Sequence, residues 1–244
     1  MEQRATGGEH TALSVPTLIL WDIDGTLMHC GGDGTKALNG TFRRLYGVED
    51  AFRHAGIGSA MDSVILDRIL DHFTLTHADK DLIKTIYIET LEEILAANQE
   101  KKILPGILPL LDFIEETEQL YCGLLTSNFQ AGARTKLASV GLEQRFLFGG
   151  FGDSQWEKWD AALAAVDEAE TLYGVTFSRE NTWIIGDSAY DIQSAKKLGM
   201  KSIAVATGWM SEERLAEEAP DYLFPDLSAY EQVIRILLSA SQTA

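Results

Sequence analysis

From Pro105 to the C-terminus, short apolar runs alternate with segments of helical periodicity, and this alternation limits the possible folds more than any other feature of the chain. Strands that are separated by helices form parallel β-α-β units, so the pattern predicts an α/β fold with a doubly wound, mostly parallel sheet. An earlier apolar run, Thr17–Trp21, is stopped by an Asp-Gly turn and adds a first strand. The later strands are predicted at 121–126, 146–148, 182–185, 202–206 and 222–224. Helices are predicted at about 107–118 and 158–173 and around 230–237, and two further helices are predicted to end at about 140 and 199.

Residues 29–100 differ from the rest of the chain because no convincing strand interrupts them. Apolar side chains recur at helical spacing in three stretches, which begin near Asp33, Asp62 and Asp79, with Asp33 in the position of an N-cap. We therefore predict two domains. Residues 1–28 and 101–244 form a Rossmann-like α/β core, and residues 29–100 form an all-helical cap inserted after the first strand.

The charge balance excludes several classes of partner. The chain has 20 Lys and Arg against 37 Asp and Glu, a formal net charge of −17, which disfavours binding to nucleic acid or to an anionic membrane. Any phosphate site must then carry its own concentrated positive charge. The chain has only two cysteines and no apolar run of signal-peptide or membrane-span length, so we expect a cytoplasmic protein, with its oligomeric state left open.

Unusual polar clusters follow three of the predicted strands: Asp22-Ile-Asp24-Gly-Thr26, Thr126-Ser127-Asn128 and Gly186-Asp187-x-x-x-Asp191. In an open parallel sheet, ligands bind beyond the carboxyl ends of the strands, so the three clusters should face one crevice. Residues i and i+2 leave a strand on the same side, so both carboxylates of the first cluster should face one point. With the aspartates of the third cluster they make an oxygen-rich site suited to Mg²⁺.

These three segments resemble the first, second and fourth motifs of the haloacid dehalogenase superfamily, in its phosphoglycolate phosphatase-like and β-phosphoglucomutase-like branch with a helical cap. The resemblance spans roughly residues 18–225, and the helical block lies where that family carries its cap. It implies a Mg²⁺-dependent phosphatase that hydrolyses a small phosphorylated metabolite, such as 2-phosphoglycolate or a sugar phosphate, through an aspartyl-phosphate.

The resemblance also implies a role for each motif residue. Asp22 would be the nucleophile, and Asp24 would protonate the leaving alcohol and then activate water. Thr126 would hydrogen-bond the phosphoryl oxygens, with Ser127 and Asn128 close by. The Mg²⁺ site would be formed by the aspartates of the first and third clusters, namely Asp22, Asp24 (through its backbone carbonyl), Asp187 and Asp191.

The cation that should face the phosphoryl group is the least defined part of the pattern. Many family members carry Lys-Pro at this point, and this chain does not. Lys158, which opens the helix before the Asp187 strand, is the nearest candidate, because relatives resembling phosphoglycolate phosphatase can carry a lone basic residue there. Lys136 is the alternative, but its position in a helix predicts an exposed side chain.

Two other functions remain open. A phosphomutase of the β-phosphoglucomutase type has a similar core but carries an arginine in the cap loop that matches Gly58–Asp62, where this chain has Ala60 and Met61. A non-catalytic phosphate-binding module would be expected to have lost a motif residue, and all are retained. A dehalogenase is disfavoured by Asp24, because a halide leaving group needs no proton.

The remaining candidate side chains have plainer interpretations. His29, His54, His72 and His77 lack metal-ligand spacing and are expected in loops or on the cap surface. The tryptophans at 156 and 159 either line a substrate pocket or pack at the start of a helix.

Overall fold

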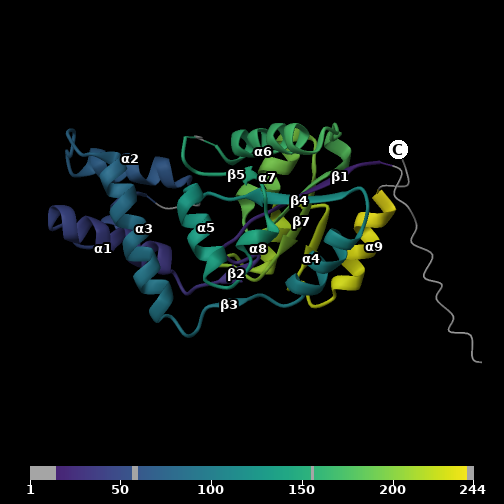
Figure 1. The fold of residues 1–244 in the computed structure, drawn as a ribbon, viewed down its shortest axis with the longest axis horizontal. Coiled ribbons are helices and arrows are strands. Elements are labelled where there is room, and N and C mark those ends of the chain that lie inside the picture. Colours follow the sequence, from purple (N-terminus) through teal and green to yellow (C-terminus); the bar gives the residue numbers. More distant parts are fainter. Residues whose placement is uncertain (1–14, 57–59, 155–156, 241–244) are drawn as a thin grey trace, which may run out of the picture.

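The computed structural model describes residues 15–56, 60–154 and 157–240. Its main element is a six-stranded parallel sheet in the order β5-β4-β1-β6-β7-β8 (Figure 1). The chain adds β4 and β5 on one side of β1 and then returns to add β6 on the other side, so β1 lies at the switch point of a doubly wound sheet. The strands are β1 Thr17–Trp21, β4 Leu120–Leu125, β5 Gly149–Gly150, β6 Thr182–Gly186, β7 Lys201–Val205 and β8 Tyr222–Phe224.

Helices cover both faces of the sheet, and the alternation of side chains along β1 shows how. Ile19 and Trp21 belong to a core cluster shared with helices α4, α5 and α9, whereas Leu18 and Leu20 pack with α6. Every residue of β1 is buried, as expected of a strand covered on both faces. These helices are α4 Ile107–Glu116, α5 Gln130–Ala138, α6 Lys158–Tyr173, α7 Ala189–Leu198, α8 Glu212–Glu217 and α9 Tyr230–Ala240.

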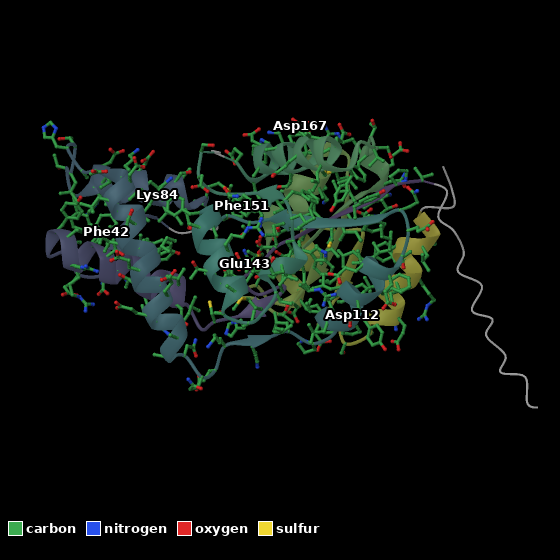
Figure 2. The ribbon with its side chains drawn as sticks, in the orientation of Figure 1. Phe42, Lys84, Asp112, Glu143, Phe151 and Asp167 are labelled. Carbon is green, nitrogen blue, oxygen red and sulfur yellow. The ribbon has the colours of Figure 1, made fainter. Side chains whose placement is uncertain are left out.

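Three helices form the cap at one end of the molecule: α1 Asp33–Tyr46, α2 Asp62–His72 and α3 Lys80–Ala97 (Figure 1). Helices α1 and α3 pack together, with Phe42 fully buried inside the cap (Figure 2). The segments that leave and re-enter the core pair as a small antiparallel ribbon, β2 Met28–His29 with β3 Lys102–Ile103. The predicted fold class is therefore confirmed, while the domain limits at 28/29 and 100/101 stay a prediction. Short 3₁₀ turns lie at Ala51–His54, Glu143–Arg145 and Arg179–Asn181.

Two local expectations were wrong. The strand predicted at 146–148 is displaced to Gly149–Gly150, where only glycine fits, because a Cβ on Gly150 would lie 2.0 Å from the carbonyl oxygen of Ala161. Asp33 is the first residue of α1 and not its N-cap, which is Gly32 in the left-handed conformation. The Asp33 carboxylate is fully buried and accepts a hydrogen bond from Asn98 Nδ2 at 2.5 Å, so it joins the two ends of the cap.

None of the described helices is long and apolar enough to cross a membrane. Helix α8, which no sequence pattern had indicated, is six residues long.

Most of the other predicted helices and strands begin and end within about two residues of their observed limits. At the start of α3, Asp79 is the N-cap, and its side chain accepts hydrogen bonds from the backbone N–H groups of Asp81 and Leu82.

Candidate active site

Three buried carboxylates meet where β1 and β6 end. Asp22 follows β1, and its N–H donates to Ile185 of β6, which extends the parallel ladder by one residue. Asp187 follows β6, and Asp191 lies in the first turn of α7. One carboxylate oxygen from each of the three residues lies within 4.8 Å of the others. We refer to Asp22, Asp187 and Asp191 as the carboxylate cluster.

Lys158 supplies a positive charge to this cluster. It is the first residue of α6, and Nζ lies 3.1 Å from Asp22 Oδ1 and 2.7 Å from Asp191 Oδ1. Its side chain is only 3% exposed. Burial lowers the pKa of Lys158, but the two carboxylates outweigh that effect and hold the pKa above its ordinary value. The structure thus brings together the predicted nucleophile and the predicted basic residue.

The local hydrogen bonding fixes Asp191 in place. It is the third residue of α7 and forms a capping box with Ser188, whose N–H and Oγ both donate to Asp191 Oδ2, at 3.1 and 2.6 Å. The other carboxylate oxygen is the one that meets Lys158. The segment 188–191 therefore both begins helix α7 and orients the Asp191 carboxylate toward Lys158.

The charges of the cluster do not balance, since three carboxylates surround one lysine. Burial raises the pKa of Asp22 to about 6, with Lys158 opposing that shift and Asp191 and Asp24 adding to it. Burial likewise raises the pKa of Asp187 well above its usual value, and the neighbouring Asp22 adds to the effect. An excess of two negative charges on hard oxygen atoms fits a divalent cation such as Mg²⁺.

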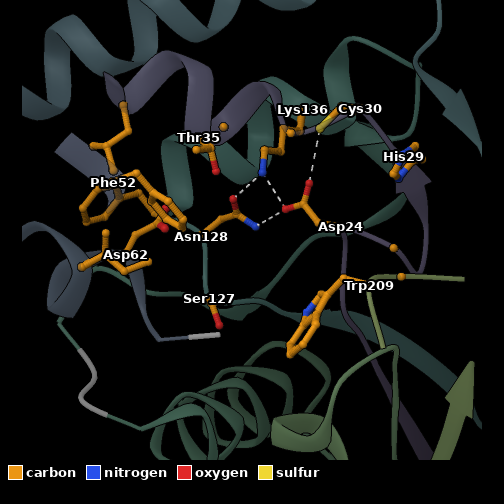
Figure 3. A pocket seen from close by; sticks show the side chains of 18 of the residues that line it. Asp24, His29, Cys30, Thr35, Phe52, Asp62, Ser127, Asn128, Lys136 and Trp209 are labelled. Atoms are coloured by element: carbon orange, nitrogen blue, oxygen red, sulfur yellow. Dashed lines mark hydrogen bonds and ion pairs between the residues drawn. The ribbon is translucent and has the colours of Figure 1, made fainter. Parts of the chain in front are cut away.

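Asp24 does not join the cluster, contrary to the expectation that its carboxylate would face the same point as that of Asp22. Its Oδ2 accepts hydrogen bonds from Lys136 Nζ at 2.5 Å and Asn128 Nδ2 at 2.8 Å, and Cys30 Sγ lies 3.4 Å from Oδ1 (Figure 3). Burial raises the pKa of Asp24, but Lys136 and these hydrogen bonds outweigh it and hold the pKa below its ordinary value.

The prediction that Lys136 is exposed was wrong. The residue is 4% exposed, and Nζ donates to Asn128 Oδ1 at 2.6 Å as well as to Asp24. Helix α5 is covered by cap helix α3 on this side, where the rings of Tyr87 and Phe129 lie edge to face. A signal was available in the sequence, because Lys136 lies three and four residues after Ala133 and Gly132, two small residues on the same, buried face of α5.

The second motif forms the wall of the site that follows β4. Thr126 Oγ1 accepts hydrogen bonds from the backbone N–H of Asn128 at 3.3 Å and from its side-chain amide at 2.7 Å. Asn128 therefore links Thr126 to both Asp24 and Lys136. Ser127 lines the cavity beside them, and its carbonyl accepts from the N–H of Asp62 in the cap at 2.8 Å (Figure 3).

Two aspartates that the sequence did not single out join the cap to the start of α5. Asp62 Oδ2 accepts from the N–H of Phe129 at 2.9 Å, and Asp153 Oδ2 accepts from the N–H of Gln130 at 2.6 Å. Asp153 also pairs with Lys84 of α3 at 3.3 Å, at the boundary between cap and core (Figure 2). These contacts place the cap directly over the site. Burial raises the pKa of Asp62 to about 6, although Lys136 opposes the shift.

A cavity of about 610 Å³ lies between cap and core and reaches Asp24 and Asp187. Figure 3 looks into it, with the Asp24–Lys136–Asn128 contacts on one wall and Trp209 on another. The core side is polar, and the cap side is mostly apolar. Its lining comprises Asp24, Gly25, His29, Cys30, Gly31, Gly32, Gly34, Thr35, Leu38, Phe52, Ala60, Asp62, Ile65, Tyr87, Ser127, Asn128, Phe129, Lys136, Asp187, Gly208 and Trp209.

The histidines and tryptophans have the structural surroundings expected of non-catalytic residues, with one partial exception. His29 is exposed but lines the cavity, whereas His54 and His72 stack on each other at 4.4 Å on the cap surface. Trp159 packs under Lys197, whose Nζ lies 3.5 Å from the ring centre. Trp156 and the first part of the cap loop, residues 57–59, lie outside the described residues.

The fold and the site agree with the family whose model matches this sequence. Residues 19–205 match the family model of haloacid dehalogenase-like hydrolases, and the chain belongs to that family. A phosphoglycolate phosphatase of Pseudomonas fluorescens is 23% identical over 223 residues, an alignment that covers 87% of this chain and 78% of that protein.

Solved structures show the same fold. The structure of CbbY from Rhodobacter sphaeroides in complex with phosphate superimposes on this chain with a TM-score of 0.67 at 20% identity. The alignment covers 88% of this chain and 96% of the CbbY chain. A Thermotoga maritima protein described as a candidate β-phosphoglucomutase gives a TM-score of 0.61 at 20% identity, with 91% of this chain and 100% of that chain covered. At these identities the likeness concerns the fold alone.

Proposed function

We propose that this protein is a Mg²⁺-dependent phosphatase that hydrolyses a small phosphomonoester through an aspartyl-phosphate on Asp22. The observation that carries the proposal is the buried carboxylate cluster with Lys158 bound to both Asp22 and Asp191. The phosphatase names of its relatives support the same reaction. Among substrates, 2-phosphoglycolate and sugar phosphates are the candidates that the resemblance supplies.

In the first step, a carboxylate oxygen of Asp22 forms a bond to phosphorus while the bond from phosphorus to the alcohol oxygen breaks. Lys158, 3.1 Å from Asp22, would offset the charge of the phosphoryl oxygens, and Thr126 and backbone N–H groups beside it would bind them. Mg²⁺ bound by the carboxylates of Asp22, Asp187 and Asp191, with the Asp24 carbonyl, would neutralise negative charge on the nucleophile and the phosphoryl group.

Asp24 is proposed as the acid and base of the reaction. It would give a proton to the leaving alkoxide and then take one from the water that hydrolyses the aspartyl-phosphate, which releases inorganic phosphate and restores Asp22. The donors around Asp24 favour its ionised form, which suits the second role. The first role requires the carboxylate to receive a proton and to turn from Lys136 toward the substrate.

Two alternatives are less well supported. A phosphomutase would need a cation in the cap loop, and the part of that loop that the structure describes, Ala60–Asp62, presents a carboxylate to the cavity. A non-catalytic binding module would have no use for an intact nucleophile, acid/base and basic residue, and this chain has all three.

The direct test is release of inorganic phosphate from a panel of phosphomonoesters in the presence of Mg²⁺, with p-nitrophenyl phosphate as a reactive reference. Hydrolysis of at least one member of the panel is expected. Failure to hydrolyse any of them would contradict the proposal. Formation of glucose 6-phosphate from β-glucose 1-phosphate, without phosphate release, would establish the mutase instead.

A further inference from the structure

The cavity is large for 2-phosphoglycolate, the substrate in the name of the Pseudomonas fluorescens relative. Its volume of about 610 Å³ lies in the range of pockets that enclose drug-sized ligands. In the proposed mechanism the phosphoryl group lies beside Asp22 and Lys158, and the cavity reaches this region at Asp24 and Asp187. A glycolate leaving group would then fill only a small part of the space that extends from Asp24 to the cap helices.

Part of the cap wall of this space is apolar. Leu38 of α1, Phe52 of the first 3₁₀ turn and Ile65 of α2 line the cavity, and Tyr87 of α3 and Ala60 add to this apolar part. Among these five residues the Tyr87 hydroxyl is the one hydrogen-bonding side chain. Thr35, His29 and Asp62 also line the cap side, so polar groups border the apolar part.

The charges of the cavity also disfavour an anionic leaving group. Among the lining residues that the structure describes, Lys136 is the one lysine or arginine, and it is already paired with Asp24. On the cap side the cavity is also lined by the Asp62 carboxyl and the His29 imidazole. A carboxylate on a leaving group that reaches Asp62 would lie beside another carboxyl without a free lysine or arginine, which is unfavourable.

An exposed aromatic side chain stands on the other side of the cavity from Phe52. Trp209 is 69% exposed, the largest exposed fraction among the large apolar side chains that the structure describes (Figure 3). Its loop is held against the site, because Thr207 Oγ1 donates to the carbonyl of Gly25 at 2.5 Å and Gly208 leaves no room for a Cβ beside Asp187. The indole is thus fixed next to the metal-binding end with its ring still available to a ligand.

We infer that the leaving group of the substrate is uncharged, larger than glycolate and apolar on one face, and that it lies between the cap wall and Trp209. The inference rests on the proposed phosphatase function and narrows its substrate class. Burial of apolar surface at Leu38, Phe52 and Ile65 and contact with the Trp209 ring would then provide binding that a small polar leaving group does not receive.

The first experiment compares three esters of primary alcohols: benzyl phosphate, ethyl phosphate and 2-phosphoglycolate. All three need a protonated leaving oxygen, so the comparison isolates the size, polarity and charge of the leaving group. We expect kcat/KM for benzyl phosphate to exceed that for each of the other two by roughly tenfold or more. A kcat/KM for 2-phosphoglycolate equal to or above that for benzyl phosphate would overturn the inference.

The second experiment fills the cavity from the cap side. Ile65→Trp should raise KM for benzyl phosphate by roughly tenfold and change that for ethyl phosphate much less, because the smaller ester does not reach the cap wall. Leu82→Trp on α3 is the matched control, since Leu82 is 44% exposed and does not line the cavity. Equal effects of Ile65→Trp on both esters would contradict the inference, provided that the circular dichroism spectrum of the variant is native.

Trp209→Ala tests the other side of the cavity and does not disturb the cap core, because the side chain is largely exposed. It should raise KM for benzyl phosphate several-fold and leave KM for ethyl phosphate nearly unchanged. An unchanged KM for benzyl phosphate would remove Trp209 from the binding surface.

Failure of the proposed function and failure of this inference give different results. If no phosphomonoester is hydrolysed, including p-nitrophenyl phosphate, the proposed function fails, whereas hydrolysis with a preference for 2-phosphoglycolate overturns the inference alone.

Discussion

Two buried lysines, Lys158 and Lys136, contact aspartates of the segment after β1 and have very different surroundings. Lys158 contacts two members of the carboxylate cluster, and a third carboxylate lies beside them, so the region carries an excess of negative charge. Lys136 contacts one carboxylate, Asp24, and one neutral amide, Asn128, so the charges there balance. With all groups ionised, the first arrangement carries negative charge that a divalent cation would offset, and the second pairs one positive charge with one negative charge.

The comparison separates two tasks that the sequence motifs do not distinguish. If Asp22 is the nucleophile, as proposed, phosphorus is attacked in the Lys158 region, where burial raises the pKa of Asp22 and Asp187. In the Lys136 region, Lys136 and neighbouring hydrogen bonds hold the pKa of Asp24 below its ordinary value. Under the proposed mechanism, Lys158 acts on the phosphoryl group and Lys136 acts on Asp24.

The largest effect is expected from removal of the nucleophile. Asp22→Asn keeps the shape of the side chain but cannot form the aspartyl-phosphate, so kcat should fall by several orders of magnitude. Steady-state phosphate release with p-nitrophenyl phosphate measures this loss. Turnover above about 1% of wild type would show that Asp22 is not the nucleophile, and Asp112→Asn at an exposed ion pair of α4 is the control that should remain active.

Removal of Mg²⁺ should change the charge balance of the carboxylate cluster around Lys158 and not that of the Asp24–Lys136 pair. Chelation with EDTA should abolish activity and Mg²⁺ should restore it, because the cluster carries two uncompensated negative charges. Mg²⁺ should also raise Tm by several degrees, since saturation at about 100 times Kd stabilises a protein by roughly 2.7 kcal/mol. Asp187→Asn should weaken this Tm shift. Full activity in metal-free buffer would contradict the assignment of the cluster.

The two lysines should differ in the size of their effects. Lys158→Ala should lower kcat/KM by roughly 10²-fold or more, as is typical when a charge contact to the transition state is lost, and Lys158→Arg should recover part of it. Lys136→Ala should lower kcat/KM by about tenfold, because it acts on the substrate only through Asp24. Inhibition by vanadate should weaken for Lys158→Ala alone. The reverse order would exchange the roles of the two lysines.

Asp24→Asn should distinguish alkyl from aryl esters. An alkoxide needs a proton to leave and nitrophenolate hardly does, so turnover of an alkyl phosphate should fall roughly tenfold more than that of p-nitrophenyl phosphate. Lys136→Ala should show the same selectivity in a weaker form if it positions Asp24. Equal losses on both esters would mean that Asp24 contributes mainly through its backbone carbonyl to the metal.

The smallest effect concerns stability at the junction of cap and core. Because the pKa of Asp62 is raised from 3.8 to about 6, the folded protein binds more protons there than the unfolded chain between those two pH values. This carboxyl therefore makes the protein less stable as pH rises from about 4 to 6, and the loss persists above pH 6. Asp62→Asn should raise the free energy of unfolding at pH 7 by roughly 1 to 2 kcal/mol and not at pH 4. An equal change at both pH values, measured by urea denaturation, would contradict the shift.

The sequence by itself determined most strands of the sheet, the order of the longer helices and the three motifs, because these depend on local patterns, whereas strand β5 and helix α8 were missed. The strand β1 is apolar from Leu18 to Trp21 since both of its faces are covered, and the capping box that orients Asp191 lies within four consecutive residues. Strand ends of a parallel sheet share one edge, so Asp22 and Asp187 had to meet once the fold class was known.

Only the tertiary structure decided where the side chains of Asp24 and Lys136 lie. The sequence places Asp24 two residues after Asp22, but its orientation depends on donors from the loop after β4 and from α5, more than 100 residues away. Lys136 is buried because the cap returns over α5, a contact between segments that no local periodicity relates. The cavity between cap and core has the same origin. Local pattern sets which residues form an element, whereas long-range packing sets what each buried charge contacts.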